Sequence, residues 1–423
     1  MGITSALYSG VSGLNTNSQA MSVIGNNLAN TNTLGFKGAR TVFSDLLSSN
    51  ISGSGGSSQV GRGVNISKVD NIFSQGTFEA TASNTDVAIE GEGFFMLKEV
   101  GNDTTFYSRA GAFRFDADGF LVNPEGFHVQ GKAFDVDGNI IPGDPTDIQV
   151  ANVGLVPAKV TDELILNTNL DASEVPPLAA FNPDIPATFN YSASTTTFDT
   201  LGNSHLVSLY FVKDAADNTW NWHWTAEDAN GNPLGNPPAV PMGQIIFNED
   251  GTLDETIAGN GTGAILAADI DWDNGSVATG IDITFDTTQF NSASTVISQD
   301  QNGYGAGNLT NVGINEEGIV IASYSNGQQV KVSNLVLAKF NNPGGLEMVG
   351  SNMFVGTDAS GAARSGLPGP ELGKIFTNSL EQSNVDMGQE FVKMITTQRG
   401  FQANSKIITT VDELLGELIN LKR

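Results

Sequence analysis

Apolar residues recur every seven positions at both ends of this 423-residue chain, a spacing typical of α-helices that pack against other helices. In the N-terminal stripe, Leu7, Leu14, Met21 and Leu28 are seven residues apart, and Ile3 and Ile24 occupy the second position of the same seam. A helix over residues 3–29 would be about 40 Å long, at ~1.5 Å per residue. It carries no charge, because the first Asp, Glu, Lys or Arg in the chain is Lys37. A helix without charges has no broad face suited to solvent, so we expect other structure to cover most of it.

A second stripe lies at the other end and consists of Met387, Met394, Phe401, Ile408, Val411, Leu415 and Leu418. It predicts a helix that runs to about residue 421. Ser383 or Asn384 is expected to cap this helix, with Asp386 in its first turn, where a carboxylate is favourable beside free N–H groups. The basic residues at 422 and 423 suit its negative C-terminal end.

Glycines interrupt both predicted helices, and they are Gly10, Gly13, Gly25, Gly388, Gly400 and Gly416. Each costs a helix about 1 kcal/mol relative to alanine, and isolated helices are marginal in water in any case. We therefore expect the two helices to need partners, either each other or copies on neighbouring molecules. Ordinary core helices would show similar stripes. The missing charges and the flexible flanking segments favour an assembly interface in which many copies bury these helices together.

The sequence between the helices is typical of β structure. Asp-Gly and Asn-Gly pairs separate short alternating or apolar runs, as in hairpins. We expect a mixed α and β, multidomain fold, with the terminal α-helices forming a coiled-coil-like inner domain and with nested, mainly antiparallel β domains. The expected parts are a helical domain (1–30 with 383–423), connecting segments (31–82 and 365–382), a first β domain (83–150 with 301–364) and an inserted acidic outer β domain (151–300).

Charge and composition exclude several classes of function. The formal net charge is −27, and residues 151–300 hold 20 acidic residues against two lysines. Such a chain is unsuited to nucleic acid or to an anionic membrane. The absence of cysteine excludes disulfides, thiolate metal sites and thiol catalysis.

The start of the chain does not resemble a cleaved signal peptide, and no run of about 18 apolar residues occurs. We expect either a cytoplasmic protein or export by a route without a cleaved signal.

No cluster of residues predicts an enzyme, a metal site or a cofactor, although paired carboxylates leave glycosidase chemistry open. The acidic segments 271–275 and 135–138 lack the rest of a calcium-binding loop and are interpreted as hairpin turns. Alternation places three tryptophans on one strand face, and they are Trp220, Trp222 and Trp224. A sugar-stacking platform or a subunit contact is possible there, but a packed core face is favoured. His223 would then point the other way, as a surface or pocket group.

Three motifs resemble the axial proteins of the bacterial flagellum, in the rod and hook branch. The first covers residues 25–37 and includes Asn26, Asn27, Ala29, Asn30, Thr33, Gly35, Phe36 and Lys37. The second is found at residues 85–95, 107–113 and 118–122. The third includes Ser383, Asn384, Val385 and Asp386, followed by residues 398–404. Residues 376–380 depart from the glycine-rich approach that this family usually has before the third motif.

The resemblance implies terminal helices in the inner layer of a tube and β domains in its outer layers. The additional residues 151–300 favour a subunit of the hook, the curved, flexible tube that transmits torque from rod to filament, over the alternative of a distal rod subunit. By resemblance the partners are further copies of the chain, the hook cap protein, the distal rod protein, the hook–filament junction protein and the flagellar type III export apparatus. The implied location is extracellular, reached without a cleaved signal, and no nucleic acid, membrane or cofactor is implied.

Overall fold

The computed structural model describes residues 2–47, 49–53, 56–135, 138–150, 155–235 and 240–420. One long helix lies at each end, α1 (Gly2–Ala29) and α2 (Met387–Asn420), and most of the sequence between them is β structure. The predicted fold class is confirmed. The chain divides into two compact units. The first is Met1–Val153, Asn311–Ala322 and Gln329–Arg423, and the second is Gly154–Thr310 and Ser323–Gln328.

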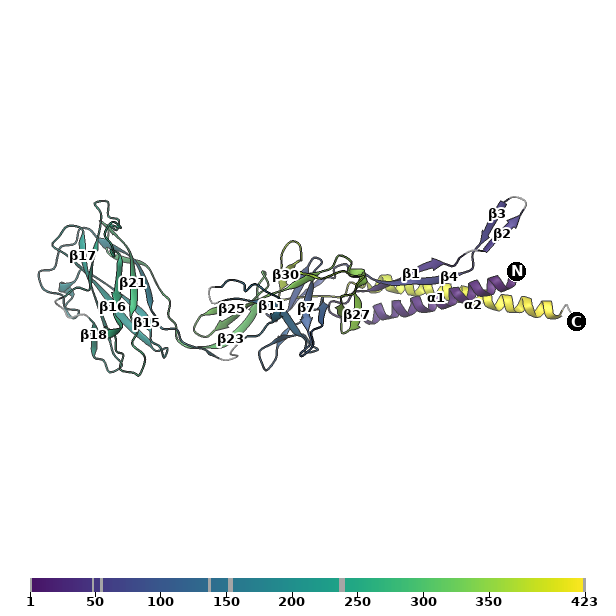
Figure 1. The fold of residues 1–423 in the computed structure, drawn as a ribbon, viewed down its shortest axis with the longest axis horizontal. Coiled ribbons are helices and arrows are strands. Elements are labelled where there is room, and N and C mark those ends of the chain that lie inside the picture. Colours follow the sequence, from purple (N-terminus) through teal and green to yellow (C-terminus); the bar gives the residue numbers. More distant parts are fainter. Residues whose placement is uncertain are drawn as a thin grey trace. The chain divides into compact units, whose positions relative to one another are not determined.

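In the first unit, α1 and α2 lie side by side and form a helix pair (Figure 1). An antiparallel ribbon of β1 (Ala39–Asp45) and β4 (Val64–Asn71) also packs on α1, and the hairpin of β2 (Ser49–Gly53) and β3 (Gly56–Val60) connects its two strands. The backbone N–H of Val64 donates to Ser12 Oγ at 3.3 Å. Ribbon and hairpin thus occupy part of the segment that was expected to connect domains. Among the described residues, no helix has the length and apolar character needed to cross a bilayer.

The β domain of the first unit is built on one sheet, in which the central strands form a continuous path and short strands pair at its sides. Its central strands, in spatial order, are β24 (Ile319–Tyr324), β25 (Gln329–Leu335), β11 (His128–Ala133), β7 (Phe94–Lys98), β8 (Thr105–Ser108), β28 (Met353–Val355) and β27 (Glu347–Gly350). The branches are β9 (Arg114–Phe115), β10 (Leu121–Val122), β12 (Thr146–Asp147), β26 (Leu337–Lys339) and β29 (Arg364–Gly366). Buried apolar side chains from many of these strands, among them Phe95, Leu97 and Leu335, form the core.

The chain returns to this domain just before α2. Strand β30 (Lys374–Thr377) pairs with β6 (Val87–Glu90), and β31 (Ser379–Glu381) pairs with β5 (Phe78–Ala80). Asn378 joins β30 to β31 with a positive φ of 51°, which lies within the segment that departs from the family pattern. These pairings bring the residues that precede α2 close to the residues that follow α1.

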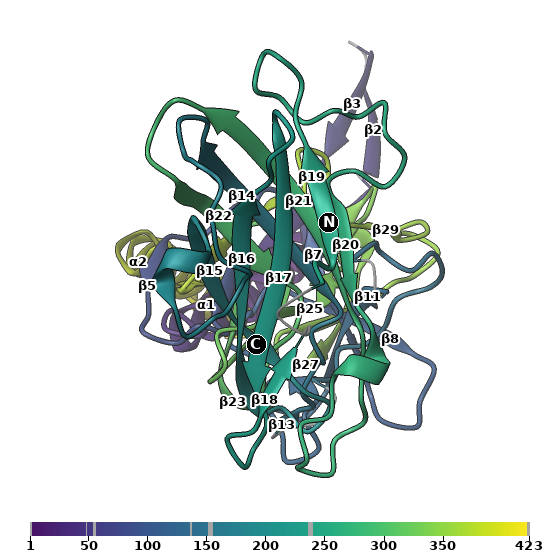
Figure 2. The same ribbon diagram turned by 90° about the vertical axis from the view of Figure 1, so that its left-hand side faces the viewer.

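The second unit consists of two sheets with a common core. One sheet has the order β20 (Thr262–Ile265), β21 (Ile281–Phe290), β14 (Glu163–Asp171), β22 (Thr295–Gln301). The other has β15 (Tyr191–Phe198), β16 (Ser204–Lys213), β17 (Thr219–Glu227) and β18 (Pro233–Gly235), and β19 (Gly243–Ile246) also pairs with β17. The short β13 (Leu155–Val156) pairs with the beginning of β23 (Gly307–Ile314). Only β14 and β21 run parallel among these pairs. Strands β14 to β22 face the viewer in Figure 2.

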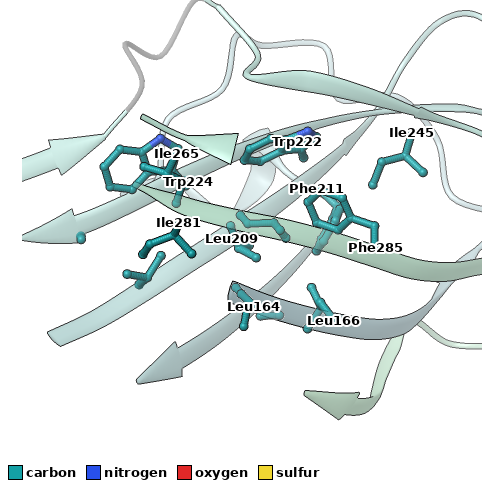
Figure 3. Packing of buried hydrophobic residues seen from close by; sticks show 14 of the residues in the cluster. Leu164, Leu166, Leu209, Phe211, Trp222, Trp224, Ile245, Ile265, Ile281 and Phe285 are labelled. Atoms are coloured by element: carbon teal, nitrogen blue, oxygen red, sulfur yellow. The ribbon is translucent and has the colours of Figure 1, made fainter. Parts of the chain in front are cut away.

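The tryptophans of β17 confirm the packed-face interpretation. All three are at most 2% exposed and contribute to the core, where Trp222 and Trp224 lie among Leu209, Phe211 and Phe285 (Figure 3). His223 points to the other side of the strand and is also buried, with its ring stacked on Phe181 at a centroid distance of 4.1 Å. It is therefore a buried side chain and not a surface group.

Side chains brace the acidic turn at 271–275. Asp271 Oδ1 accepts the backbone N–H of Asp273 at 3.1 Å, and Asn274 donates to the buried Asp199 at 2.6 Å. Asp271 thus accepts a hydrogen bond within the turn, and Asp199 accepts one from outside it, so that both carboxylates stabilise this hairpin turn. In the other acidic turn, Val136 and Asp137 lie outside the described residues.

Candidate assembly interface

Small residues form the face of α1 that is buried in the helix pair. The buried positions are three or four residues apart and are Gly10, Gly13, Thr16, Ala20, Ile24 and Asn27. A methyl group on Gly13 would lie 2.7 Å from Asn404 Nδ2 of α2, and one on Gly10 would lie 3.2 Å from Ile408 Cγ1. A methyl group on Gly400 of α2 would lie 3.1 Å from Asn17 Oδ1 of α1. Three of the glycines that weaken the helices, Gly10, Gly13 and Gly400, therefore allow the two helices to approach closely.

The predicted N-terminal stripe lies beside this small-residue face. Leu7, Leu14, Met21 and Leu28 are half-buried, and only Ile24 is fully buried, at 8% exposure. At about 100° per residue, the leucine and methionine positions are turned roughly a quarter circle from the centre of the buried face. The side chain of Ile3 lies outside the described residues.

The predicted C-terminal stripe faces α1 over most of its length. Val411 is buried at 6% exposure, and the half-buried members are Met394, Phe401, Ile408 and Leu415. Met387 is 48% exposed, and the side chain of Leu418 lies outside the described residues. The structure thus brings most of this stripe into the contact between the two helices of one chain.

Large apolar side chains on the outside of the helix pair have no partner within the described chain that buries them. Met387, Phe391 and Ile395, which we call the outer stripe, are spaced four residues apart and are 45–50% exposed. Further exposed apolar side chains on the two helices are Tyr8, Val11, Val392, Ile407 and Leu414. Sequence reasoning found only Met387 of the outer stripe. The spacing of four residues between these side chains is the sequence signal that indicates the rest of the stripe.

The motif residues gather where the helices join the β domain. Asn27 is buried, exchanges two hydrogen bonds with the backbone of Ala39 (2.7 and 2.9 Å) and donates to Glu390 of α2 at 3.3 Å. Glu390 is 5% exposed and also accepts from Lys393 at 2.6 Å. Phe36 is 4% exposed. The base of the helix pair is therefore held by polar contacts, whereas farther along the pair small residues of α1 meet larger side chains of α2, such as Ile408.

Other motif residues shape the turn after α1. Asn30 donates to Asn26 O at 2.9 Å, and Thr33 donates to Asn30 Oδ1 at 3.0 Å. Gly35 has φ of +65°, and a side chain there would collide with the backbone of Ala110 at 2.6 Å. The side chain of Ala29 is exposed.

The cap of α2 differs from the prediction. Helix α2 begins at Met387, and Asp386 caps it, because its Oδ1 accepts the backbone N–H of Gln389 at 3.0 Å. Asn384 accepts from Gly38 N at 2.8 Å and donates to Ile72 O at 2.7 Å instead. Ser383 accepts a hydrogen bond from the N–H of Val385 at 3.3 Å, and Val385 packs within reach of Gly38. Long-range contacts therefore occupy Asn384, and a local hydrogen bond with Val385 occupies Ser383, the two residues that local sequence favoured as caps.

Family models match four segments of this chain. They are Flagella basal body rod protein at residues 7–37, Flagellar hook protein FlgE/F/G D1 domain at 88–158, Flagellar basal body protein FlaE D2 domain at 169–304, and Flagellar basal body rod FlgEFG protein C-terminal at 377–421. Together these segments include both helices and parts of both units.

Whole-length relatives are also found. The flagellar hook protein FlgE of Borreliella burgdorferi is 37% identical, with 99% of each chain covered, and that of Escherichia coli is 36% identical, with 99% of this chain and 100% of the relative covered. Among solved structures, the Helicobacter pylori hook protein FlgE2 has a similar fold, with a TM-score of 0.52 at 14% identity over 73% of this chain and 99% of the other.

Proposed function

This chain belongs to the flagellar hook protein family, and from that premise we propose that it polymerises through its helix pair into the tube of the hook. It is a structural subunit of the hook, and this function is favoured over that of a distal rod subunit, because hook proteins match it over its whole length. We propose no catalytic role for it.

One observation carries the proposal: α1 buries mostly small side chains against α2, and the outer face of α2 exposes large apolar ones. The outer stripe and Val392 put four large apolar side chains into solvent over the first turns of α2. Contiguous apolar patches on a soluble subunit mark sites of protein contact. A neighbouring copy that covers this surface would stabilise both helices, which their glycines otherwise weaken.

The half-buried predicted stripes have a second part in this proposal. Leu7, Leu14 and Met21 lie at the edge of the contact between α1 and α2. A copy that packs along this edge would complete their burial. The inner layer of the tube would then form from helix pairs, each making contacts within its own chain and contacts with its neighbours.

The acidic second unit would lie in an outer layer of the tube, because the family resemblance implies that the β domains surround an inner layer of helices. Its surface charge would make contacts between neighbours wet and weak, and such contacts allow sliding as a tube curves. We place the subunit in the extracellular part of the flagellum, exported without a cleaved signal. Its partners would be other copies, the hook cap protein, the distal rod protein, the hook–filament junction protein and the export apparatus.

The test compares two substitutions on one helix. Phe391→Asp places a charge in the outer stripe, whereas Gln402→Asp places the same charge at an exposed polar position of α2. We expect Phe391→Asp to prevent tube formation by the purified chain, seen by negative-stain microscopy, and Gln402→Asp to permit it. Circular dichroism spectra of both variants check that their β domains remain folded. Normal tubes from Phe391→Asp would overturn the proposed interface.

A further inference from the structure

Three charged side chains are completely enclosed at the base of the helix pair, and we call them the ion cluster: Lys37, Arg109 and Glu381. The side chains of Lys37 and Glu381 are 0% exposed and that of Arg109 is 2% exposed. Lys37 Nζ lies 2.7 Å from Glu381 Oε1, and Arg109 Nη1 lies 3.4 Å from Glu381 Oε2. One carboxylate therefore contacts two buried cations.

The three residues come from the three segments that meet at this point. Lys37 follows the end of α1, and Glu381 ends β31 shortly before α2 begins. Arg109 directly follows β8 of the β domain. We call the residues just after α1 and just before α2 the roots of the two helices. The ion cluster joins both roots to the β domain through side chains that are distant in sequence.

Backbone groups add hydrogen bonds to the cluster, but the buried Arg109 Nε has no hydrogen-bond partner among the described residues. Lys37 Nζ donates to Ser74 O at 2.8 Å, and Glu381 Oε1 accepts the N–H of Gly76 at 2.8 Å. Arg109 Nη2 donates to Gly91 O at 2.6 Å, and its guanidinium lies over the ring of Phe94, 5.1 Å from the centroid. Each charged group therefore has fixed hydrogen-bond directions, so that the segments are held in one relative orientation.

Glu381 carries the one negative charge of the ion cluster and neutralises part of the charge of both cations. Burial lowers the pKa of both Lys37 and Arg109, and the negative charge of Glu381 acts against that shift in both. Removing one partner of a buried ion pair leaves a desolvated charge, which destabilises far more than the pair itself stabilises. Loss of Glu381 would leave two such cations, whereas loss of Lys37 would leave the matched pair of Arg109 and Glu381.

We propose that Glu381 is a positioning residue that clamps the roots of α1 and α2 to the first β domain, so that torque passes between the helix pair and the β domain through the ion cluster. The inference rests on the proposed function, because torque reaches these segments only in an assembled tube. It adds a specific mechanical element that the assembly interface does not contain.

Hydrogen exchange on the full chain tests the clamp without assembly. The reporters are backbone N–H groups that bond across the roots: Gly35 to Glu381 O, Gly38 to Asn384 Oδ1 and Gln382 to Thr77 O. We expect Glu381→Gln to accelerate exchange at all three by about tenfold or more, while amides of β7 keep their protection. Lys37→Met should accelerate exchange at Gly35 and Gly38 but spare Gln382.

A matched control separates clamping from general stability. Leu121→Ala removes a fully buried core side chain of the same unit, outside the ion cluster. It should lower the free energy of unfolding without selective exchange at the roots. Should Glu381→Gln prove too unstable to purify, Lys37→Met still provides the test, since unchanged exchange at Gly35 and Gly38 in this variant would contradict the clamp.

Torsional compliance of assembled hooks provides the second measurement, from rotational fluctuations of a bead attached to the hook. We expect hooks of Glu381→Gln subunits to be more compliant than those of wild-type and Leu121→Ala subunits. Compliance equal to that of Leu121→Ala hooks would overturn the clamp. Failure of the wild-type chain to form tubes would overturn the proposed function instead, and the exchange data would still decide whether the clamp exists.

Discussion

The second unit and the helix pair bury different kinds of side chain. The second unit encloses three tryptophans together with Phe211 and Phe285, each at most 2% exposed. The helix pair encloses glycine, alanine and threonine on α1, while Phe391 and Ile395 of α2 stay about half exposed. Burial of aromatic rings is a large source of stability, and burial of small residues is a minor one. The comparison suggests that the second unit is stable within one chain, whereas the helix pair depends on its neighbours.

Deletion of residues 2–29 would separate the two regions most completely. We expect the shortened chain to form no tubes at any concentration and to keep the β-sheet signal of its circular dichroism spectrum, because both β cores remain. Electron microscopy and sedimentation check the two expectations. Tubes formed by this chain would show that α1 is dispensable for assembly.

A substitution in the aromatic core tests whether this core stabilises the second unit within one chain. Trp222→Ala should destabilise the second unit by about 3–5 kcal/mol, the usual cost of a large aromatic cavity. Denaturant unfolding followed by far-ultraviolet circular dichroism measures it. Leu178→Ala, at a fully exposed position of the same unit, is the control and should change stability little. An equally small effect of Trp222→Ala would mean that this core is not the main source of stability.

Two glycines of α1 test how the helix pair is packed. A side chain at Gly25 would meet no atom within 4 Å, so Gly25→Ala should stabilise α1 by about 1 kcal/mol through helix propensity alone. Gly13→Ala offers the same propensity, but its methyl group would press on Asn404. We expect a smaller gain, or a loss, in the thermal stability of the helical signal. A larger gain for Gly13→Ala than for Gly25→Ala would contradict the close approach of the helices at this position.

The smallest effect concerns pH and the second unit. Burial lowers the pKa of His223 from its ordinary value near 6.5. Below about pH 6.5 the unfolded chain takes up a proton that the folded unit does not bind, so stability falls as the pH is lowered through this range. His223→Phe keeps a ring for Phe181 to stack on and removes the titration. Denaturant midpoints at pH 7 and 5.5 should therefore differ less for this variant than for the wild-type chain.

Much of this fold could be predicted from the sequence, because its signals are local. The seven-residue spacing indicated both helices, and alternation placed the three tryptophans on a packed face. The face of α1 that meets α2 was missed, because glycine and alanine give no hydrophobic signal. The cap at Asp386 was missed because Asn384 is engaged by Gly38 and Ile72, which are distant in sequence. The same reason hid the contact of Lys37 with Glu381, 344 positions away.

Hydrogen exchange compared between the dilute monomer and the assembled tube tests the dependence of the helices on neighbours most directly. The amides of α1 and α2 beyond the ion cluster should exchange quickly in the monomer and become protected in the tube, while those of β14 and β16 stay protected in both. Equal, strong protection of both helices in the monomer and in the tube would contradict the account.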